Sequence, residues 1–254
     1  MQLQNFTYSE YIELLNILKS NRVNLTFREW DKLNAKPNSF FLLRHDIDYS
    51  LTSALEMAKI ENSIGIKATY FLLMSSNNYN LLSEEYCNIP KQLIELGHEV
   101  GLHYDVQAIY KRDKINFTEQ LELEIDILSK LSNKKITSIA MHNPSIYGKD
   151  PFKNIANYIN AYNEELTQNI SYYSDSCGAW RDNAYYSFMN NKLPNKLQLL
   201  IHPIFWSKNN TNRWIQYENF LENKINKLKK EKIDIFNIWK NHIGLKEHEA
   251  RSKI

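Results

Sequence analysis

This sequence has little of what marks a secreted, disulfide-stabilised protein or a membrane protein. Its 254 residues include only two cysteines, Cys87 and Cys177, which lie far apart and form no CxxC pair. We therefore expect reduced thiols, and neither a disulfide framework nor a structural zinc site built from cysteine. No run of about 18 apolar residues occurs, so the sequence predicts no membrane-spanning helix. Gly/Ser-rich linkers and internal repeats are missing as well.

An excess of charge of one sign is also missing. The 31 Lys and Arg residues face 29 Asp and Glu residues, which leaves a formal net charge of +2. A nucleic-acid-binding protein usually carries a strong basic field, so we expect no nucleic-acid partner. The basic run at residues 223–234 lies within an apolar repeat of helical period, which indicates a solvated helix face. The first residues lack the basic and apolar segments of a secretory signal, so we expect a cytoplasmic location.

What the sequence does have is a regular alternation of apolar, strand-like runs with stretches of helical periodicity. Such alternation predicts parallel strands joined by right-handed crossovers, and hence an α/β fold that is either a doubly wound sheet or a barrel. The chain length suits a single domain over residues 1–254. We expect strands at residues 39–46, 66–74, 98–104, 136–143, 171–176 and 197–206, and helices at residues 50–65, 83–97, 116–131 and 214–239.

Side chains that can bind metals or transfer protons follow these apolar runs. Asp46 and Asp48 end the first run, in "FLLRHDIDYS". Side chains two apart on a strand share a face, and two like charges that close either raise one pKa or need a cation between them. A single histidine at a strand end is usually structural, so the functional prediction depends on convergence. Because functional groups of parallel α/β folds gather at the carboxyl ends of strands, we expect the two acids to meet His103, Asp105, His142, Asp175 and His202.

The order of these segments resembles a known family. "FLLRHDIDYS", "GIKATYFLL", "ELGHEVGLHYD", "HNPS", "DSCGAW" and "LLIHP" follow one another as in the polysaccharide deacetylases with a NodB-homology domain, which are carbohydrate esterase family four. The sequence is most similar to the cytoplasmic branch associated with capsule and O-antigen sugars. The resemblance covers a motif core of about residues 40–206, with helical extensions at both ends. It implies a distorted (β/α) barrel with about seven parallel strands and a divalent metal, most often Zn²⁺.

The resemblance also implies roles for the matching residues. Asp46 corresponds to the general base of the family, and Asp48 to the metal-binding aspartate of the first motif. His103 corresponds to the first metal-binding histidine, and His202 to the general acid. Further residues are candidates for binding substrate or supporting the site: Asp105, Asn143, Asp175, Trp180 and Arg181.

The third metal ligand is left open by a departure from the family pattern. The family's second metal-binding histidine lies four residues after the first, where this chain has Gln107, a poor zinc ligand. His142 follows another strand, so one hypothesis completes the triad of Asp48 and His103 with His142. Asp105 is the competing third ligand.

A second departure concerns the arginine that the family places beside the general base, because this chain has His142 in that motif. Arg44 and Arg181 are both candidates to supply the missing guanidinium. Two other histidines are expected to serve the fold only. His45 should point to the face of the first strand opposite Asp46, and His98 begins a strand at its amino end, the end that serves stability in barrels.

The resemblance, carried by these residues, implies a metal-dependent hydrolase that removes an acetyl group from an N-acetylated sugar in the biosynthesis of surface polysaccharides. A cytoplasmic enzyme of this class would act on a nucleotide-linked or lipid-linked sugar precursor. One alternative is an amidohydrolase for a small amide. Another is a degenerate domain that binds carbohydrate and has lost catalysis. The oligomeric state is left open.

Overall fold

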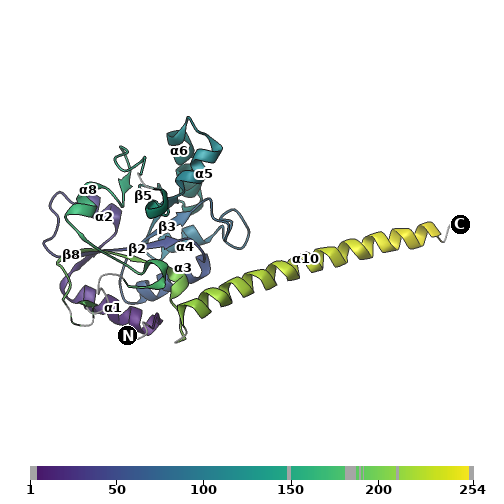
Figure 1. Ribbon diagram of the computed structural model, residues 1–254, viewed down its shortest axis with the longest axis horizontal. Coiled ribbons are helices and arrows are strands. Elements are labelled where there is room, and N and C mark those ends of the chain that lie inside the picture. The colour runs from purple at the N-terminus through teal and green to yellow at the C-terminus, as the bar shows by residue number, and fades with distance from the viewer. Residues whose placement is uncertain are drawn as a thin grey trace. The chain divides into compact units, whose positions relative to one another are not determined.

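The computed structural model describes residues 5–147, 150–180, 187–188, 190, 192–209 and 212–251, with the side chains of residues 147 and 244–251 left out. The chain divides into two compact units, residues 1–210 and 211–254. The first contains the sheet and its helices, and the second is the long helix α10 (Arg213–Arg251) (Figure 1). The single domain predicted over residues 1–254 stays a prediction. None of the helices in the described part of the chain combines the length and apolar character that spanning a bilayer requires.

Seven parallel strands of the first unit form a curled sheet, a partly closed barrel, and β1 lies beside the first half of β2. Their order across the sheet is β6-β5-β4-β3-β2-β8-β7. This confirms the predicted α/β barrel with about seven parallel strands. The strands are β1 (Val23–Leu25), β2 (Phe40–Ile47), β3 (Thr69–Leu73), β4 (Glu99–Tyr104), β5 (Ser138–Met141), β6 (Ile159–Asn160), β7 (Ser171–Ser174) and β8 (Lys196–Ile201).

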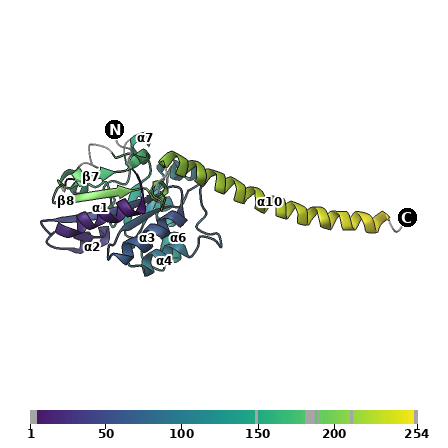
Figure 2. The same ribbon diagram turned by 90° about the horizontal axis from the view of Figure 1, so that it is seen from below.

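Helices flank the sheet, as the crossovers between parallel strands require. In Figure 2, α1, α3, α4 and α6 lie together on one side of the strands β7 and β8. The helices of the first unit are α1 (Tyr8–Asn21), α2 (Phe27–Lys32), α3 (Leu51–Ser63), α4 (Ile89–Glu95), α5 (Val106–Arg112), α6 (Phe117–Ser132), α7 (Pro144–Tyr147) and α8 (Glu164–Gln168), with short 3-10 helices η1 (Ser176–Gly178) and η2 (Pro203–Phe205).

Local sequence features explain where two of the helices begin and end. The predicted helix over residues 50–65 forms as α3, where the Ser50 hydroxyl accepts a hydrogen bond from the backbone of Ser53 at 3.1 Å. Gly65 follows α3 with a φ of 69°, a conformation that glycine adopts at helix ends. The helix predicted over residues 83–97 is shorter than expected, because α4 begins only at Ile89 with Pro90 in its first turn. Proline lacks a backbone donor and is favoured at that position.

The side chains of β2 alternate between the inside and the outside of the curl. Phe40 and Leu42 belong to a buried apolar cluster that also includes Phe71 of β3. Arg44 and Asp46 follow at the same two-residue spacing and therefore share their face. The interior is apolar at the amino end of β2 and charged at its carboxyl end. This gradient positions the candidate site at the carboxyl edge of the sheet.

His45 points to the other face of β2, into a buried polar cluster. Its Nε2 lies 2.7 Å from Oε1 of Glu61 on α3. Tyr11 of α1 donates to the same oxygen at 2.5 Å, and Tyr70 of β3 donates to Oε2 at 2.8 Å, while His98 Nδ1 lies 3.6 Å from Oε2. Burial raises the pKa of Glu61, but His45, His98 and Tyr11 together outweigh burial, so this pKa is lowered. His45 thus connects β2 with two helices, in line with the structural role expected for it.

Candidate metal centre

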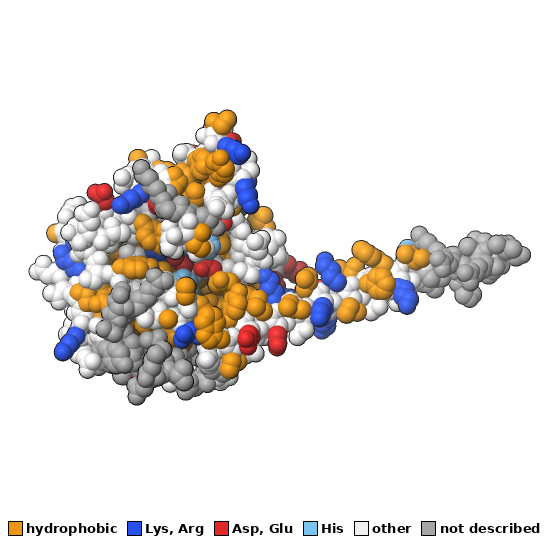
Figure 3. Space-filling view, in the orientation of Figure 1, with side chains coloured by type: hydrophobic (Ala, Val, Ile, Leu, Met, Phe, Trp, Pro, Cys, Tyr) orange, Lys and Arg blue, Asp and Glu red, His pale blue; other side chains and the backbone are white. Residues whose placement is uncertain are grey.

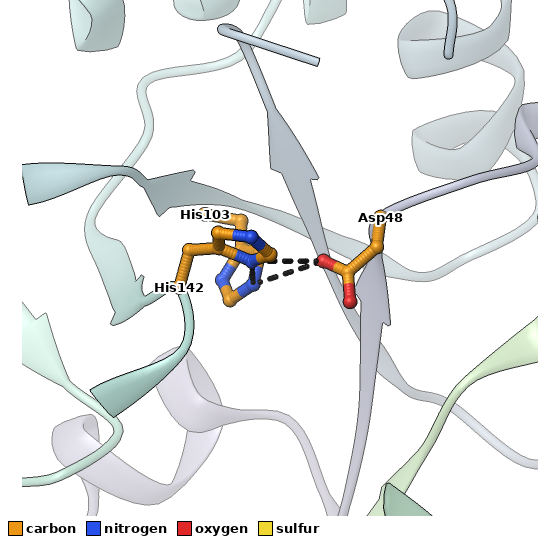
Figure 4. A group of neighbouring side chains, drawn as sticks. All are labelled: Asp48, His103 and His142. Atoms are coloured by element: carbon orange, nitrogen blue, oxygen red, sulfur yellow. Dashed lines mark hydrogen bonds and ion pairs between the residues drawn. The ribbon is translucent and has the colours of Figure 1, made fainter. Parts of the chain in front are cut away.

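Asp48, His103 and His142 point toward one another at the carboxyl edge of the sheet (Figure 4). Oδ1 of Asp48 lies 3.2 Å from Nε2 of His103 and 3.2 Å from Nδ1 of His142. The two imidazole nitrogens lie 3.1 Å apart. Among the described residues, this is the group of His, Cys, Asp and Glu side chains whose ligand atoms all fall within 4.8 Å. We therefore treat these three side chains as a possible metal-binding triad.

The curl of the sheet explains how residues from separate strands can meet. Asp48 follows β2, His103 lies in β4, and His142 follows β5. Strand β3 separates β2 from β4, and strands two apart in a flat sheet would be about 9–10 Å apart. Because the sheet curves around its inner face, side chains that project inward from these strands converge. Only inward-facing positions can take part.

The donor set of the triad suits a divalent cation. Oδ1 of Asp48 is buried and accepts no hydrogen bond of regular geometry from the described residues. Such an oxygen is costly to leave unpaired, and two imidazoles with one carboxylate are a ligand set that zinc accepts. Burial raises the pKa of Asp48, but the two imidazoles outweigh burial, so this pKa lies well below its usual range. The carboxyl is therefore ionised, as a ligand must be.

The second nitrogen of each imidazole is held by a neighbouring group, which orients the first toward the triad. Nδ1 of His103 lies 3.0 Å from the backbone carbonyl of Ala140, to which it can only donate. The lone pair of His103 is then on Nε2, the atom that faces Asp48. Nε2 of His142 lies 2.8 Å from Nδ2 of Asn143, which can only donate, so Nε2 accepts this hydrogen bond. Asn143 itself has a φ of 47°, a left-handed conformation that asparagine tolerates better than most residues.

Asp46 lies beside the triad in a buried ion pair with Arg44. Nε and Nη2 of Arg44 donate to Oδ1 and Oδ2 of Asp46, both at 2.7 Å. Oδ2 also lies 3.7 Å from Nε2 of His103. Burial raises the pKa of Asp46, but Arg44 and then His103 outweigh burial, so this pKa is lowered. Of the two arginines considered from the sequence, Arg44 is the one next to Asp46, and Arg181 lies outside the described residues.

His202 approaches the triad from the opposite side, after β8. Its Nε2 lies 3.9 Å from Oδ2 of Asp48. Its Nδ1 lies 2.7 Å from Oδ1 of Asp175, a fully buried carboxylate that also accepts hydrogen bonds from the backbone of His202 and from the indole of Trp206. Burial lowers the pKa of His202, but the charge of Asp175 and of the two site acids outweighs burial and raises it to about 9. The imidazole is therefore protonated at neutral pH with Nε2–H directed at the site.

Asp175→Asn is expected to bring the pKa of His202 from about 9 down towards the ordinary histidine value. Asparagine has the same size and still accepts a hydrogen bond, but it removes the negative charge that favours the imidazolium. An NMR titration of the His202 imidazole in metal-free protein would measure the change. Asp126→Asn, at an exposed position on α6, is the matched control and should leave the pKa unchanged. Equal titration midpoints in the wild type and Asp175→Asn would contradict this explanation.

Three other positions considered from the sequence have different surroundings. Asp105 caps α5, because its Oδ1 accepts from the backbone of Gln107 at 2.8 Å and of Ala108 at 3.2 Å. The geometry therefore groups His142, and not Asp105, with Asp48 and His103. The side chain of Gln107 is exposed. Trp180 is partly exposed and belongs to an aromatic cluster with three other rings: Phe6, Phe188 and Trp206.

The loop after β3 holds the backbone at Asp48 in a way that the sequence did not reveal. Tyr79 donates to the carbonyl of Ile47 at 2.5 Å. Ser76 and Asn78 donate to the carbonyl of Asp48 at 3.2 and 3.0 Å. Serine, asparagine and tyrosine are common in any loop, so no sequence pattern pointed to these three. They fix the position from which the Asp48 side chain enters the site.

Comparison with known proteins gives matches among solved structures only. No family model and no curated protein matches the sequence. A carbohydrate esterase family 4 pseudoenzyme from Bacillus anthracis is similar over 75% of this chain and 60% of its own, with 16% identity and a TM-score of 0.43. A peptidoglycan deacetylase from Bacillus subtilis is similar over 74% and 84%, with 16% identity and a TM-score of 0.44. A family 4 carbohydrate esterase from Bacillus anthracis is similar over 84% of this chain and 85% of its own, with 13% identity and a TM-score of 0.42. Likenesses this distant carry no argument about chemistry, which depends on the residues of this chain.

Proposed function

We propose that this chain is a metal-dependent deacetylase that hydrolyses the amide bond of an N-acetylated sugar. The observation that supports it most is the convergence of Asp48, His103 and His142 within 3.2 Å of one another. A carboxylate, Asp46, and a protonated imidazole, His202, flank this triad. The order of motifs along the sequence points to the same activity.

Each side chain has a task that amide hydrolysis requires. Asp48, His103 and His142 would hold a divalent metal, most simply Zn²⁺, which when bound polarises the acetyl carbonyl and acidifies the attacking water. Asp46 has a low pKa and is ionised, and its Oδ2 can accept the proton of that water. Arg44 orients the carboxylate through two hydrogen bonds.

His202 would complete the reaction as the general acid. The C–N bond breaks when the leaving nitrogen receives a proton, which Nε2–H of His202 can donate. Asp175 fixes the ring through Nδ1, and its negative charge raises the pKa of His202 and so favours the imidazolium that can donate this proton. The products are acetate and the free amine of the sugar, and the proton taken by Asp46 balances the one that His202 gives.

The same proposal includes the class of substrate. A hollow in the first unit contains acidic and histidine side chains and is bordered by apolar ones (Figure 3). The partly exposed Trp180 belongs to an aromatic cluster, and aromatic rings can pack on the apolar faces of sugars. The resemblance to the capsule and O-antigen branch favours a nucleotide-linked or lipid-linked sugar precursor in the cytoplasm. A surface-polysaccharide pathway would consume the deacetylated product.

Acetate release by the zinc-loaded full chain tests this function. We expect acetate and an equal amount of free amine from a nucleoside-diphosphate N-acetylhexosamine or a lipid-linked N-acetylhexosamine, and none from a simple acetamide. Turnover of the simple amide alone would favour a small-amide hydrolase instead. Tight zinc binding without turnover of any of these compounds would favour a degenerate carbohydrate-binding domain.

A further inference from the structure

The helix α10 carries an apolar stripe along one side, which Figure 3 shows as a row of hydrophobic side chains. Its members recur every three or four residues, the spacing that keeps side chains on one face of a helix, except for one step of seven residues between Leu228 and Ile235, where Lys232 occupies the intermediate position. Apart from Tyr217, their exposed fractions run from 37% to 63%. The members are Trp214, Tyr217, Leu221, Ile225, Leu228, Ile235, Trp239 and Ile243.

We propose that α10 is a dimerisation element, and that two copies of this chain pair antiparallel through the stripe. An exposed apolar stripe of this length, interrupted only at Lys232, marks an interaction surface. The stripe contains two tryptophans, the side chain that can bury the most surface area at an interface. Trp214 and Trp239 are 55% and 63% exposed. Four such tryptophans in a dimer offer on the order of 400 Å², a substantial part of the roughly 1,200 Å² that stable interfaces bury.

The residue pattern of the stripe is complementary to itself when one helix is reversed. If Trp214 of one copy lies level with Trp239 of the second, Ile225 lies level with Leu228 of the second copy. Glu222 then lies level with residue 231 of the second copy, two residues along the helix from Lys229. Both side chains lie on the same flank of the stripe. Two-fold symmetry repeats this contact, so the dimer contains two Glu222–Lys229 pairs. Both side chains are exposed.

A parallel pairing lacks this complementarity. Glu218 and Lys232 lie on the same face of the helix as the stripe, because each is three or four residues from a stripe member on either side. In a parallel, in-register dimer each would face its own copy, and like charges that meet at an interface are unfavourable. In the antiparallel pair Lys232 instead lies level with Leu221 and Glu222 of the second copy.

A second copy also fits better than a lipid surface. Helices that lie on anionic membranes carry lysines and arginines along the borders of their apolar face. Here the border mixes charges, since Glu218 and Glu222 lie beside Lys229. The acids would meet the phosphates of such a membrane, whereas in the dimer each acid has a lysine within reach.

Sedimentation of the full chain over a micromolar concentration series tests the proposal. We expect a monomer–dimer equilibrium that Glu222→Lys weakens about tenfold, because two attractive pairs become repulsive. The double variant Glu222→Lys with Lys229→Glu should restore dimerisation, since it exchanges the partners. Asp234→Lys makes the same change in charge on the opposite side of the helix and should have no effect.

Three results would overturn the proposal. The first is a wild-type chain that stays monomeric at all concentrations, whether or not it binds vesicles of anionic phospholipid. The second is a dimer that survives Leu228→Asp, because the stripe would then lie outside the interface. The third is a double charge exchange that fails to restore the affinity lost in Glu222→Lys, which would exclude the antiparallel register. Circular dichroism of each variant checks that α10 stays helical.

Discussion

Asp48→Asn is expected to abolish tight zinc binding and to lower kcat/KM for acetate release by about a thousandfold or more. Asparagine preserves the shape of the side chain but removes the charge of the one carboxylate in the triad. In the wild type, Oδ1 of Asp48 lies 3.2 Å from Nε2 of His103 and 3.2 Å from Nδ1 of His142. Residues that only orient metal ligands cost about 10–100-fold when lost, and a ligand itself should cost more. Calorimetric zinc titration and steady-state kinetics measure the two effects.

Further variants supply the control for this prediction and the result that would contradict it. Asp126→Asn, on the exposed surface of α6, makes the same chemical change and should leave zinc affinity unchanged. Asp105→Asn keeps an oxygen that can cap α5 and should also leave zinc bound. If Asp105→Asn lost zinc while His142→Gln kept it, Asp105 would be the third ligand and the triad described above would be wrong.

Asp46→Asn is expected to keep zinc but to reduce kcat by about 10²–10⁴-fold, the range that loss of a positioned general base usually gives. Asparagine cannot accept the proton of the attacking water. The change also leaves Arg44, which is fully buried, without its counter-charge, and breaking such a pair costs about 3–5 kcal/mol of stability. Zinc affinity, kcat and thermal unfolding should therefore be measured together.

Asp46→Glu separates the loss of the base from the loss of stability. Glutamate keeps a negative charge beside Arg44, so the protein should stay folded, but the longer side chain moves the carboxylate oxygens away from the triad. We expect zinc binding close to wild type and a large loss of kcat. Wild-type turnover with either variant would exclude Asp46 as the base. In the wild-type enzyme the lowered pKa of Asp46 should keep the base ionised down to a pH below its ordinary value.

Much of the site could be predicted from strand patterns, because β-strand geometry is local. Residues two apart on a strand share a face. Arg44, Asp46 and Asp48 are therefore expected on one side of the strand, and His45 on the other. The alternation of strands with helices implied parallel strands, and parallel strands bring their carboxyl ends to one edge. The sequence alone therefore predicts that Asp48 and His103 lie at the same edge.

The third member of the triad could not be predicted in this way. Asp105 and His142 both follow an apolar strand, and local spacing treats them alike. Asp105 turns to the first turn of α5, where two backbone N–H groups lack intrahelical partners. His142 turns inward, where Asn143 holds its second ring nitrogen. Which side chain enters the site depends on these contacts and not on sequence spacing.

Glu61 shows the same limit on the outer side of the sheet. Within α3 it is one more polar residue of a helix, yet it is fully buried and accepts hydrogen bonds from Tyr11, His45 and Tyr70. Its donors come from a helix and two strands, and lie 50, 16 and 9 residues away along the chain. The sequence by itself determined a parallel α/β fold and the edge at which its strands end, because periodicity and strand polarity are local properties. Only the tertiary structure decided which side chains meet, because the curl of the sheet and the docking of its helices set distances between strands that are not neighbours.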